Sequence, residues 1–398
     1  MERVKQNIWD NYHAVYVHIP FCKQKCLYCD FASYACFGEE EMRAYTEALC
    51  HEIEVRVEEA SKVAAGATIY FGGGTPSVLP IDCLEQIVAT LKACGFWQEP
   101  AEATIEVNPG TADLTKLKRL RAAGFDRISF GVQSLQDAEL RGIGRIHSAQ
   151  EALAAIDMAR AADFGRISCD LIYGLPGQTL ASLENTVSRL IQTGIEHMSV
   201  YGLIVEEGTP LERLVSSGKI LLPEEDTAAD MYELVQSLLA KAGFERYEIS
   251  NYAKNGQYSR HNTVYWQYHP YVAFGAASCG MEENCRRTAI STVPEYIAAA
   301  KALTPATWST SELYYIEELT PAQQLEEFMF MGLRRSVGAN LAEARARFGV
   351  DVWQRYQTQL APFLERDYVR YDAVTERLYL TAKGMEIGNQ IFTIFIDA

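Results

Sequence analysis

Short β-rich segments alternate with longer helical patterns through the first half of the chain. Strands that alternate with helices in this way form parallel βα units. Six such units are too few for a closed eight-fold barrel, so we expect an α/β fold with an incomplete, TIM-like (β/α)6 barrel. A doubly wound open sheet is the alternative. The expected strands are residues 14–19, 67–71, 103–107, 126–130, 166–172 and 197–201, and the expected helices are residues 40–62, 81–93, 114–123, 149–162 and 182–192.

The pattern changes beyond about residue 210. A helix at residues 228–242 and a strand at 245–250 lead into a polar, aromatic stretch at 251–271. Three further helices, a hairpin and a last helix follow, in an order that resembles a winged helix. The expected elements of this last part are helices at residues 328–333, 341–348 and 352–366, a hairpin at 368–381 and a helix that runs into the C-terminus.

These changes predict three domains. We expect a partial barrel at residues 1–210, an extension of the barrel at 211–315, and a C-terminal α+β, winged-helix-like domain at 316–398. A winged helix can bind DNA. The acidic balance of the chain favours a compact lid or scaffold instead.

Charge and hydropathy narrow the class of protein. The 398 residues carry a net charge of −16, with 48% hydrophobic and 22% charged residues. A globular protein this acidic is a poor partner for nucleic acid or an anionic membrane, so we expect neither. No run of 18 apolar residues occurs, and the N-terminus lacks the apolar core of a signal peptide. We therefore expect a cytoplasmic protein without stable membrane insertion.

Polar and glycine-rich features follow the expected strands. A cysteine cluster comes after the first strand and a glycine run after the second, while Glu106 ends the third. Gln133 follows the fourth strand and Asp170 lies near the end of the fifth. The carboxyl ends of parallel strands meet at one edge, which is where α/β folds bind their ligands. We therefore expect a ligand site at this edge.

Three of the ten cysteines form a tight C-x3-C-x2-C loop, at Cys22, Cys26 and Cys29. A structural zinc ion usually takes four protein ligands, so a zinc loop would need Asp30 or His18 to complete it. A cubane iron–sulfur cluster has four irons. Three cysteines would leave one iron without a protein ligand, as an exchangeable coordination site.

The C-x3-C-x2-C loop after the first strand of an incomplete barrel resembles the radical S-adenosylmethionine (SAM) superfamily. That resemblance implies a [4Fe-4S] cluster held by the three cysteines, with SAM bound at the open iron and cleaved reductively to a 5′-deoxyadenosyl radical. An electron donor such as a flavodoxin or ferredoxin is then expected. The resemblance also implies SAM contacts from Tyr16, Tyr28, Gly73, Gly74, Thr75, Glu106, Gln133, Arg145 and Asp170.

Four segments resemble the oxygen-independent coproporphyrinogen III oxidase family, HemN: YVHIPFCKQKCLYCDF, GGGTPS, FGVQS and DLIYGLPGQT. The decarboxylating oxidase has a fourth cysteine two residues after the third, where this chain has Phe31. We also expect no counterpart of the longer N-terminal extension that covers the oxidase's substrate. Both features match the shorter HemW branch, whose members resemble haem chaperones that deliver haem to respiratory proteins.

The HNTVYW segment, residues 261–266, is the second mark of that branch. A histidine nitrogen can ligate haem iron, and flat aromatic side chains can contact the porphyrin. The resemblance makes His261 the expected haem contact, with His269 as the alternative ligand. A packed aromatic loop with a hydrogen-bonded histidine is the simpler interpretation of the same residues.

The family resemblance therefore predicts a radical SAM haem chaperone, with haem and a haem-accepting respiratory protein as partners. Oxidative decarboxylation of coproporphyrinogen III is the enzymatic alternative, and Phe31 counts against it. A zinc protein with a DNA-binding winged helix is the third possibility. Whether the chain catalyses a reaction is left open by the sequence.

Overall fold

The computed structural model describes residues 11–282 and 284–396, and its main feature is a twelve-stranded open sheet. The strand order is β12-β11-β10-β9-β1-β2-β3-β4-β5-β6-β8-β7. Each of the six strands from β1 to β6 pairs in parallel with the next, so the prediction of an α/β partial barrel is confirmed. These strands are β1 (Tyr12–Ile19), β2 (Val63–Gly73), β3 (Ala103–Val107), β4 (Arg127–Gln133), β5 (Arg166–Tyr173) and β6 (His197–Gly202).

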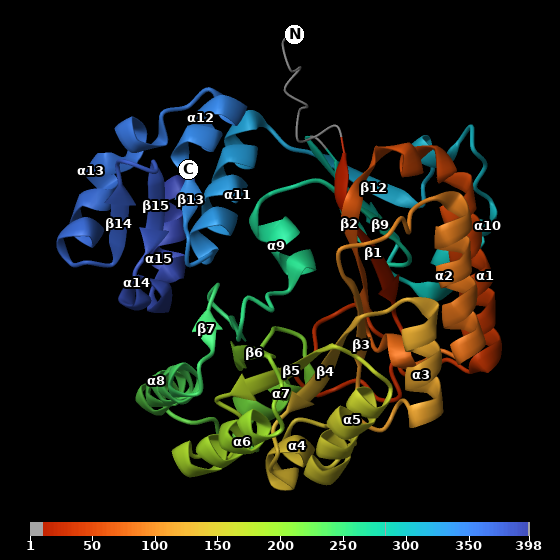
Figure 1. Cartoon of the computed structure of the whole chain (residues 1–398), viewed down its shortest axis with the longest axis horizontal. Helices are drawn as coiled ribbons and strands as arrows, with labels where there is room; N and C mark the ends of the chain where they lie inside the picture. Colours follow the sequence, from red (N-terminus) through yellow and green to blue (C-terminus); the bar gives the residue numbers. More distant parts are fainter. Residues whose placement is uncertain (1–10, 283, 397–398) are drawn as a thin grey trace.

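Helices cover the outer face of the curved sheet, and the inner face surrounds the barrel interior (Figure 1). Their order and type agree with the sequence pattern, and α5 and α6 begin at the hydroxyl N-caps Ser148 and Thr179. The short α4 (Asp137–Gly142) was not predicted. The covering helices are α1 (Glu39–Val55), α2 (Ile81–Cys94), α3 (Leu114–Ala123), α5 (Ala149–Ala161) and α6 (Leu180–Gln192).

The single helix predicted at residues 40–62 is wrong in its last part. Helix α1 ends at Val55, and a 3₁₀ helix, η2, covers Val57–Lys62. Strand β2 begins at Val63, directly after η2. The chain has no linker in which to turn toward the sheet, so its last helical residues tighten into 3₁₀ geometry.

Strands on both flanks extend the six-stranded core. On one side β9 (Tyr271–Phe274) pairs in parallel with β1. The antiparallel strands β10 (Cys279–Glu282), β11 (Cys285–Ala289) and β12 (Tyr314–Glu318) follow it, with α10 (Val293–Lys301) packed against α1. None of these elements was predicted.

On the other flank the predicted strand at 245–250 is wrong. It is divided into β7 (Glu245–Arg246) and β8 (Asn251–Ala253). Glu248 lies buried between them, and its carboxylate accepts hydrogen bonds from the Ser250 backbone nitrogen at 2.8 Å and from Arg334 Nε at 2.7 Å. The chain turns between the two strands, so β7 pairs antiparallel with β8 in place of one continuous strand.

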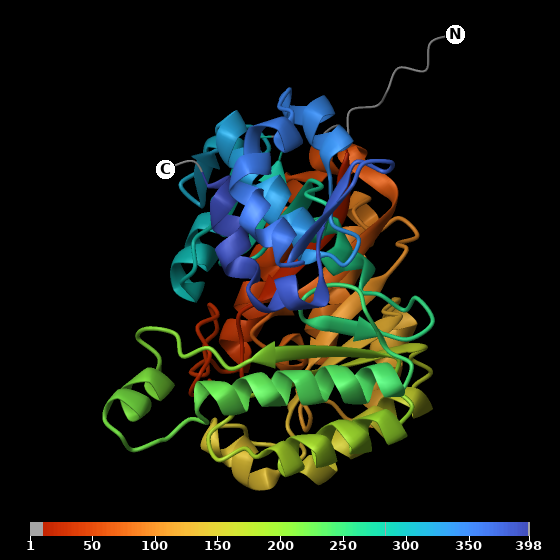
Figure 2. The ribbon, with the colours of Figure 1, turned by 90° about the vertical axis from the view of Figure 1, so that its left-hand side faces the viewer.

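Three helices lie between β6 and β9 in the chain. Helix α8 (Glu225–Lys241), predicted at 228–242, packs against α6 (Figure 2). The short α7 (Pro210–Ser216) precedes it. Helix α9 (Arg260–Trp266) contains the HNTVYW segment and contacts β1, β2 and α11 (Figure 1).

The C-terminal elements form a separate three-stranded sheet, ordered β13-β15-β14, with helices packed against it. The winged-helix-like order of elements is the one predicted. The helices and strands are α11 (Pro321–Arg334), β13 (Ala339–Asn340), α12 (Leu341–Phe348), α13 (Val352–Glu365), β14 (Val369–Asp372) and β15 (Arg377–Leu380).

The single last helix predicted for the C-terminus is wrong. The structure has α14 (Ala382–Glu386), α15 (Gly388–Phe392) and the 3₁₀ helix η5 (Thr393–Phe395). Glycine is a weak helix former, and Gly384 packs against the Tyr368 carbonyl with no room for a Cβ atom.

Among the described residues, no helix is long and apolar enough to cross a membrane.

A buried ion cluster joins α1 to the added strands. The fully buried Arg56 guanidinium lies 3.0 Å from the carboxylate of Glu52 and 2.6 Å from that of Glu59. It also donates to the Ala273 carbonyl oxygen at 2.9 Å and lies over the Phe274 ring at 4.5 Å. The segment 52–59 thereby holds β9 in place beside β1.

Replacing Arg56 with methionine should lower the free energy of unfolding by about 3–5 kcal/mol, because two carboxylates would stay buried without their counter-charge. The midpoint of urea unfolding measures this. Arg43→Met is the matched control, since Arg43 makes its ion pairs in solvent and should leave the midpoint nearly unchanged. Equal losses in the two variants would contradict the structural role of the buried cluster.

Candidate functional site

One cavity of about 420 Å³ opens at the carboxyl ends of the parallel strands. Its volume is within the range of small-molecule sites. Most of the predicted site residues line it. They are Cys22, Cys26, Tyr28, Cys29, Gly73, Gly74, Thr75, Glu106, Gln133, Arg145 and Asp170.

The cysteine loop leaves β1 and is tied back to it by backbone hydrogen bonds. Cys22 N donates to the Tyr34 carbonyl at 2.9 Å, and Tyr34 N donates to the Pro20 carbonyl at 2.7 Å. The buried His18 lies in β1, and its Nε2 is 3.0 Å from the Ala32 carbonyl oxygen. His18 is therefore an anchor of the loop, and it is not among the residues that line the cavity.

The three thiols face the same cavity from different sides. Cys22 Sγ is 3.4 Å from Thr75 Oγ1, Cys29 Sγ is 3.8 Å from Ser33 Oγ, and Arg145 Nη1 donates to Cys26 Sγ at 3.5 Å. Cysteines ligate metals through their sulfur atoms, so the wall of this cavity contains three potential metal ligands.

The spacing of the thiols bears on the kind of metal centre. Among the described residues, no three His, Cys, Asp or Glu side chains converge closely enough to hold a single metal ion. Each cysteine of a four-iron cluster bonds a different iron, so such thiols surround a larger group.

Gly73 and Gly74, in the turn at the end of β2, have no room for a side chain. A Cβ atom at Gly73, where φ is +112°, would lie 2.5 Å from the His18 ring. One at Gly74 would lie 2.8 Å from the Phe21 carbonyl oxygen. The turn therefore packs directly on β1 and the cysteine loop, and its backbone lines the cavity next to Cys22.

Two partly buried carboxyl groups form the floor of the cavity. Removal from solvent raises the pKa of Glu106 to about 7, although the hydrogen bond from Tyr70 lowers it. Burial likewise raises the pKa of Asp170, against hydrogen bonds from Ser199 and Ser129 that lower it. Such carboxyl groups can exchange a proton or accept hydrogen bonds from hydroxyl groups of a ligand.

Gln133 ends β4 at an irregularity in its pairing with β5. Its φ of +64° is in the left-handed region, which costs a residue other than glycine about 1 kcal/mol or more. A bulge of this kind re-aims a side chain. Strain at such a position is typical of binding sites.

Two polar atoms of the cavity wall lack partners. Gln133 Oε1 and Arg145 Nε are buried and make no hydrogen bond with the described residues. Buried polar atoms without partners are costly, so both indicate a polar ligand that completes the site. Together with the three thiols and the glycine turn, they form a site into which a cluster with a bound amino acid derivative fits.

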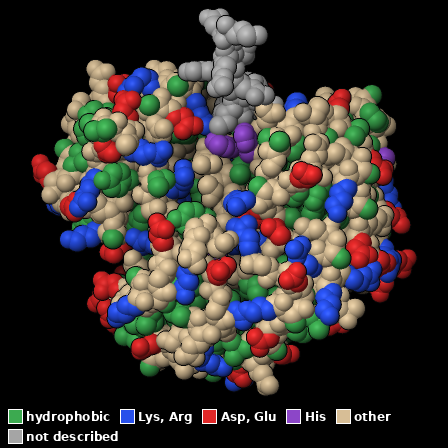
Figure 3. Space-filling model, viewed as in Figure 1, with side chains coloured by type: hydrophobic (Ala, Val, Ile, Leu, Met, Phe, Trp, Pro, Cys, Tyr) green, Lys and Arg blue, Asp and Glu red, His purple; other side chains and the backbone are tan. Residues whose placement is uncertain are grey.

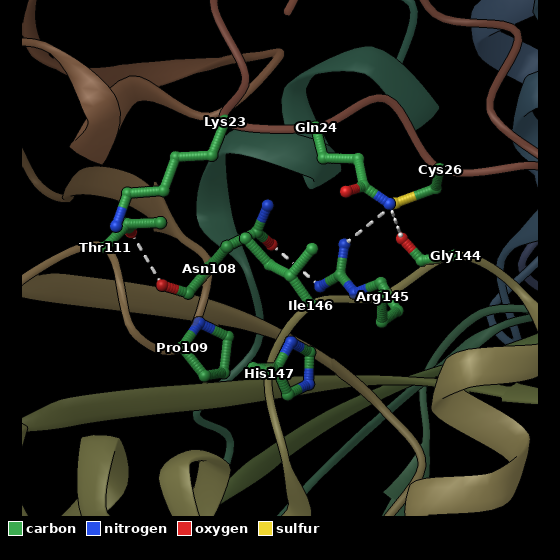
Figure 4. Close-up of a pocket in the computed structure, with 10 residues that line it drawn as sticks. All are labelled: Lys23, Gln24, Cys26, Asn108, Pro109, Thr111, Gly144, Arg145, Ile146 and His147. Atoms are coloured by element: carbon green, nitrogen blue, oxygen red, sulfur yellow. Dashed lines mark hydrogen bonds between the residues drawn. The ribbon is translucent and has the colours of Figure 1, made fainter.

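Arg145 is held by hydrogen bonds to two groups, and one of them, Asn108, was not predicted as a site residue. It donates to the Gly131 carbonyl and, at 2.8 Å, to Asn108 Oδ1 (Figure 4). Asn108 also donates to Thr75 Oγ1 at 2.7 Å, so it links the turn after β2 to Arg145. Its position directly after the third strand, in EVNPG, was a signal that could have identified it.

Tyr16 and His261 are the predicted site residues that do not line the cavity. The Tyr16 hydroxyl is 3.1 Å from His18 Nδ1 inside the barrel. His261 has an exposed fraction of 0%, with Nδ1 2.8 Å from Thr68 Oγ1 and Nε2 2.7 Å from the Tyr265 hydroxyl. Its ring is therefore a packed, hydrogen-bonded histidine in this state, and no ring nitrogen is open to a ligand.

Fold and site together define a radical SAM protein. Residues 16–190 match the Radical SAM superfamily, and residues 319–387 match the HemN C-terminal domain. The structure of coproporphyrinogen III oxidase HemN from Escherichia coli has the same fold, with a TM-score of 0.82 and 22% identity over 97% of this chain and 90% of that one.

Two bacterial relatives match over nearly their whole length. The heme chaperone HemW of Bacillus subtilis is 34% identical over 96% of this chain and 99% of that protein. The heme chaperone HemW of Lactococcus lactis subsp. lactis is 33% identical over 96% of this chain and 97% of that protein. The chain belongs to the HemW family. The radical SAM family implies a [4Fe-4S] cluster and SAM as cofactors.

Replacing Cys22, Cys26 or Cys29 with alanine should abolish incorporation of the cluster, because each remaining pair of thiols would leave two irons without a protein ligand. Iron and acid-labile sulfide should fall from about four of each per chain to nearly none after anaerobic reconstitution. Cys36→Ala is the control, since Cys36 is exposed and does not line the cavity. Full iron content in any of the three variants would contradict the assignment.

The raised pKa of Glu106 predicts a pH-dependent stability. Below about pH 4.5, the ordinary pKa of a glutamate carboxyl group, protonated Glu106 contributes fully to the free energy of unfolding. This contribution is lost as the pH rises through about 7, the pKa of Glu106 in the folded protein. Glu106→Gln keeps an acceptor for Tyr70 without the titration. Relative to wild type, the variant should gain about 1–3 kcal/mol of unfolding free energy between pH 5 and pH 8 in urea titrations. A constant difference between the two proteins would contradict the shifted pKa.

Proposed function

We propose that this protein is a radical SAM haem chaperone that binds haem and delivers it to haem proteins, which we expect to be respiratory. The observation that carries the proposal is the whole-length relationship to bacterial proteins named heme chaperone HemW. Phe31 supports it, because an exposed phenylalanine at the cavity stands where the decarboxylating oxidase has a fourth cysteine.

In this proposal Cys22, Cys26 and Cys29 hold the cluster, and the remaining wall of the cavity holds SAM. When bound, the reduced cluster would supply the one electron that cleaves the sulfonium of SAM to methionine and a radical. This chain's own groups bind and orient the pair. The backbone of Gly73, Gly74 and Thr75 would lie against SAM, and Tyr28 lines the wall beside it. The carboxyl groups of Glu106 and Asp170 would accept hydrogen bonds from SAM. The unpartnered atoms of Gln133 and Arg145 would form hydrogen bonds with it.

Haem binding through His261 requires the α9 helix to open. Its imidazole would have to leave the hydrogen bonds to Thr68 and Tyr265 before a ring nitrogen could reach iron. Burial lowers the pKa of His261 to about 3, so the packed ring is neutral, which is the form that ligates iron. His269, whose pKa burial also lowers to about 3, is the alternative ligand on the same segment.

The partners follow from this function. We expect a haem-accepting protein and an electron donor such as a flavodoxin or ferredoxin, and no nucleic acid, because the net charge is −16. Acidic and basic side chains are interspersed on the face that Figure 3 shows. The division into domains at residues 1–210, 211–315 and 316–398, and a cytoplasmic location, are parts of the same proposal.

An anaerobic haem titration of the cluster-reconstituted protein, followed by Soret absorption, tests the function. The proposal predicts saturable, stoichiometric binding that His261→Ala weakens by about tenfold or more, the loss of one iron–ligand bond. The same loss in His269→Ala instead would move the ligand to that residue. His51→Ala is the control, because His51 lies on α1 and bonds the Leu303 carbonyl.

Absence of saturable haem binding in the wild-type protein would overturn the chaperone. Turnover of coproporphyrinogen III to protoporphyrinogen under strict anaerobiosis would then establish the oxidase.

A further inference from the structure

The HNTVYW helix reaches the cofactor cavity through the interior of the barrel. The buried His261 ring is locked on both nitrogens by Thr68 and Tyr265, and its backbone nitrogen donates to Glu102 Oε1 at 3.1 Å. Glu102 precedes β3, and its own carboxylate pairs with Arg166 at 2.6 Å. Two contacts therefore fix the imidazole and a third fixes the backbone of the same residue, at the amino-terminal end of the parallel strands.

The locked ring supports a tyrosine. The rings of His261 and Tyr70 stack with centroids 4.9 Å apart and planes inclined by 27°, and Tyr16 stacks on Tyr70 at 6.3 Å. The Tyr70 hydroxyl donates to Glu106 Oε1 at 2.6 Å. A flat ring held between two others has little freedom to move its hydroxyl.

Gly72 leaves the space that this arrangement needs. A Cβ atom there would lie 2.8 Å from Tyr70 Cε1 and 3.2 Å from Glu106 Cδ. Any other residue would displace the tyrosine from the carboxylate. The first glycine of the GGG turn thus serves the Tyr70–Glu106 contact, whereas the next two serve the packing on β1.

We infer that His261 is a positioning residue for the cofactor cavity: it holds Tyr70 so that the tyrosine hydroxyl fixes the carboxyl group of Glu106. The inference rests on the proposed function in so far as Glu106 contacts SAM. Because coupling between sites is reciprocal, any event that releases His261 from Thr68 and Tyr265, haem ligation included, changes the affinity of the cavity for SAM.

The hydrogen bond from Tyr70 is a measurable marker, because it lowers the pKa of Glu106 against the effect of burial. Other groups also act on this carboxyl. Asp170 on β5 raises its pKa, whereas Arg127 on β4 and the Gly73 backbone on β2 lower it. Glu106 in turn raises the pKa values of Tyr16 on β1 and Tyr265 on α9.

The first measurement is the infrared titration of the carboxyl band that Glu106→Gln removes, in the cluster-reconstituted protein without SAM. Tyr70→Phe should raise the pKa of Glu106, since the carboxylate loses a donor. His261→Ala should raise it in the same direction. The double variant should equal Tyr70→Phe alone, because both changes act through one hydroxyl.

Two further variants separate positioning from general damage. His51→Ala is the control: His51 lies on α1, with its Nε2 3.1 Å from the Leu303 carbonyl oxygen, away from Tyr70 and Glu106. It should leave the Glu106 titration close to that of wild type. His261→Phe retains a flat ring over Tyr70 and should restore most of the wild-type titration.

The second measurement is SAM affinity by equilibrium dialysis. Tyr70→Phe and His261→Ala should each weaken it by about fivefold, the equivalent of one hydrogen bond, and the double variant by no more than Tyr70→Phe alone. An unchanged Glu106 titration in folded His261→Ala, a titration shifted as far in His261→Phe as in His261→Ala, or additive effects in the double variant would overturn the inference. A shifted titration with unchanged SAM affinity would sustain it and instead refute the proposed contact between Glu106 and SAM.

Discussion

The close approach of two loops governs the whole site. The turn after β2 lies directly on the chain that leaves β1, with Gly74 N donating to the Ile19 carbonyl at 2.8 Å and Thr75 N to the Phe21 carbonyl at 2.7 Å. These bonds extend the parallel pairing of β1 and β2 past the ends of the strands. They put Thr75 beside Cys22, so the loop with the thiols and the loop with the glycines form one wall.

Once these two loops are joined, the other groups reach the cavity by the geometry of the parallel sheet. Successive strands end at one edge, and each brings a side chain from its carboxyl-terminal part, or from the loop that follows, to the cavity. Electrostatic balance then comes from neighbours. Arg145 faces Cys26, whereas the carboxyl groups of Glu106 and Asp170 both line the cavity. Asp170 raises the pKa of Glu106, and hydrogen bonds from hydroxyl groups lower the pKa of each carboxyl group. A cationic amino acid derivative complements such a wall.

The sequence predicted the strand ends well, because the signals are local: a cysteine loop, a glycine run or a single polar residue directly after a buried strand. Tyr70 was missed because its role depends on the pairing of β2 with β3, which brings its hydroxyl to Glu106. The partners of His261 and Arg56 were missed for the same reason, since Thr68 and Ala273 are distant in sequence. The α9 helix had a local signal that went unused, the Ser259 N-cap before HNTVYW.

The central claim is that this one cavity holds both the cluster and SAM, with SAM bonded to the iron that no cysteine ligates. Electron–nuclear double resonance of the reduced cluster, with SAM labelled in its amino nitrogen or carboxylate oxygens, tests it most directly. The account predicts a hyperfine coupling from the label in the wild-type protein, and none when unlabelled SAM is used. A reduced cluster whose spectrum is the same with and without labelled SAM, at concentrations where SAM is bound, would contradict the account.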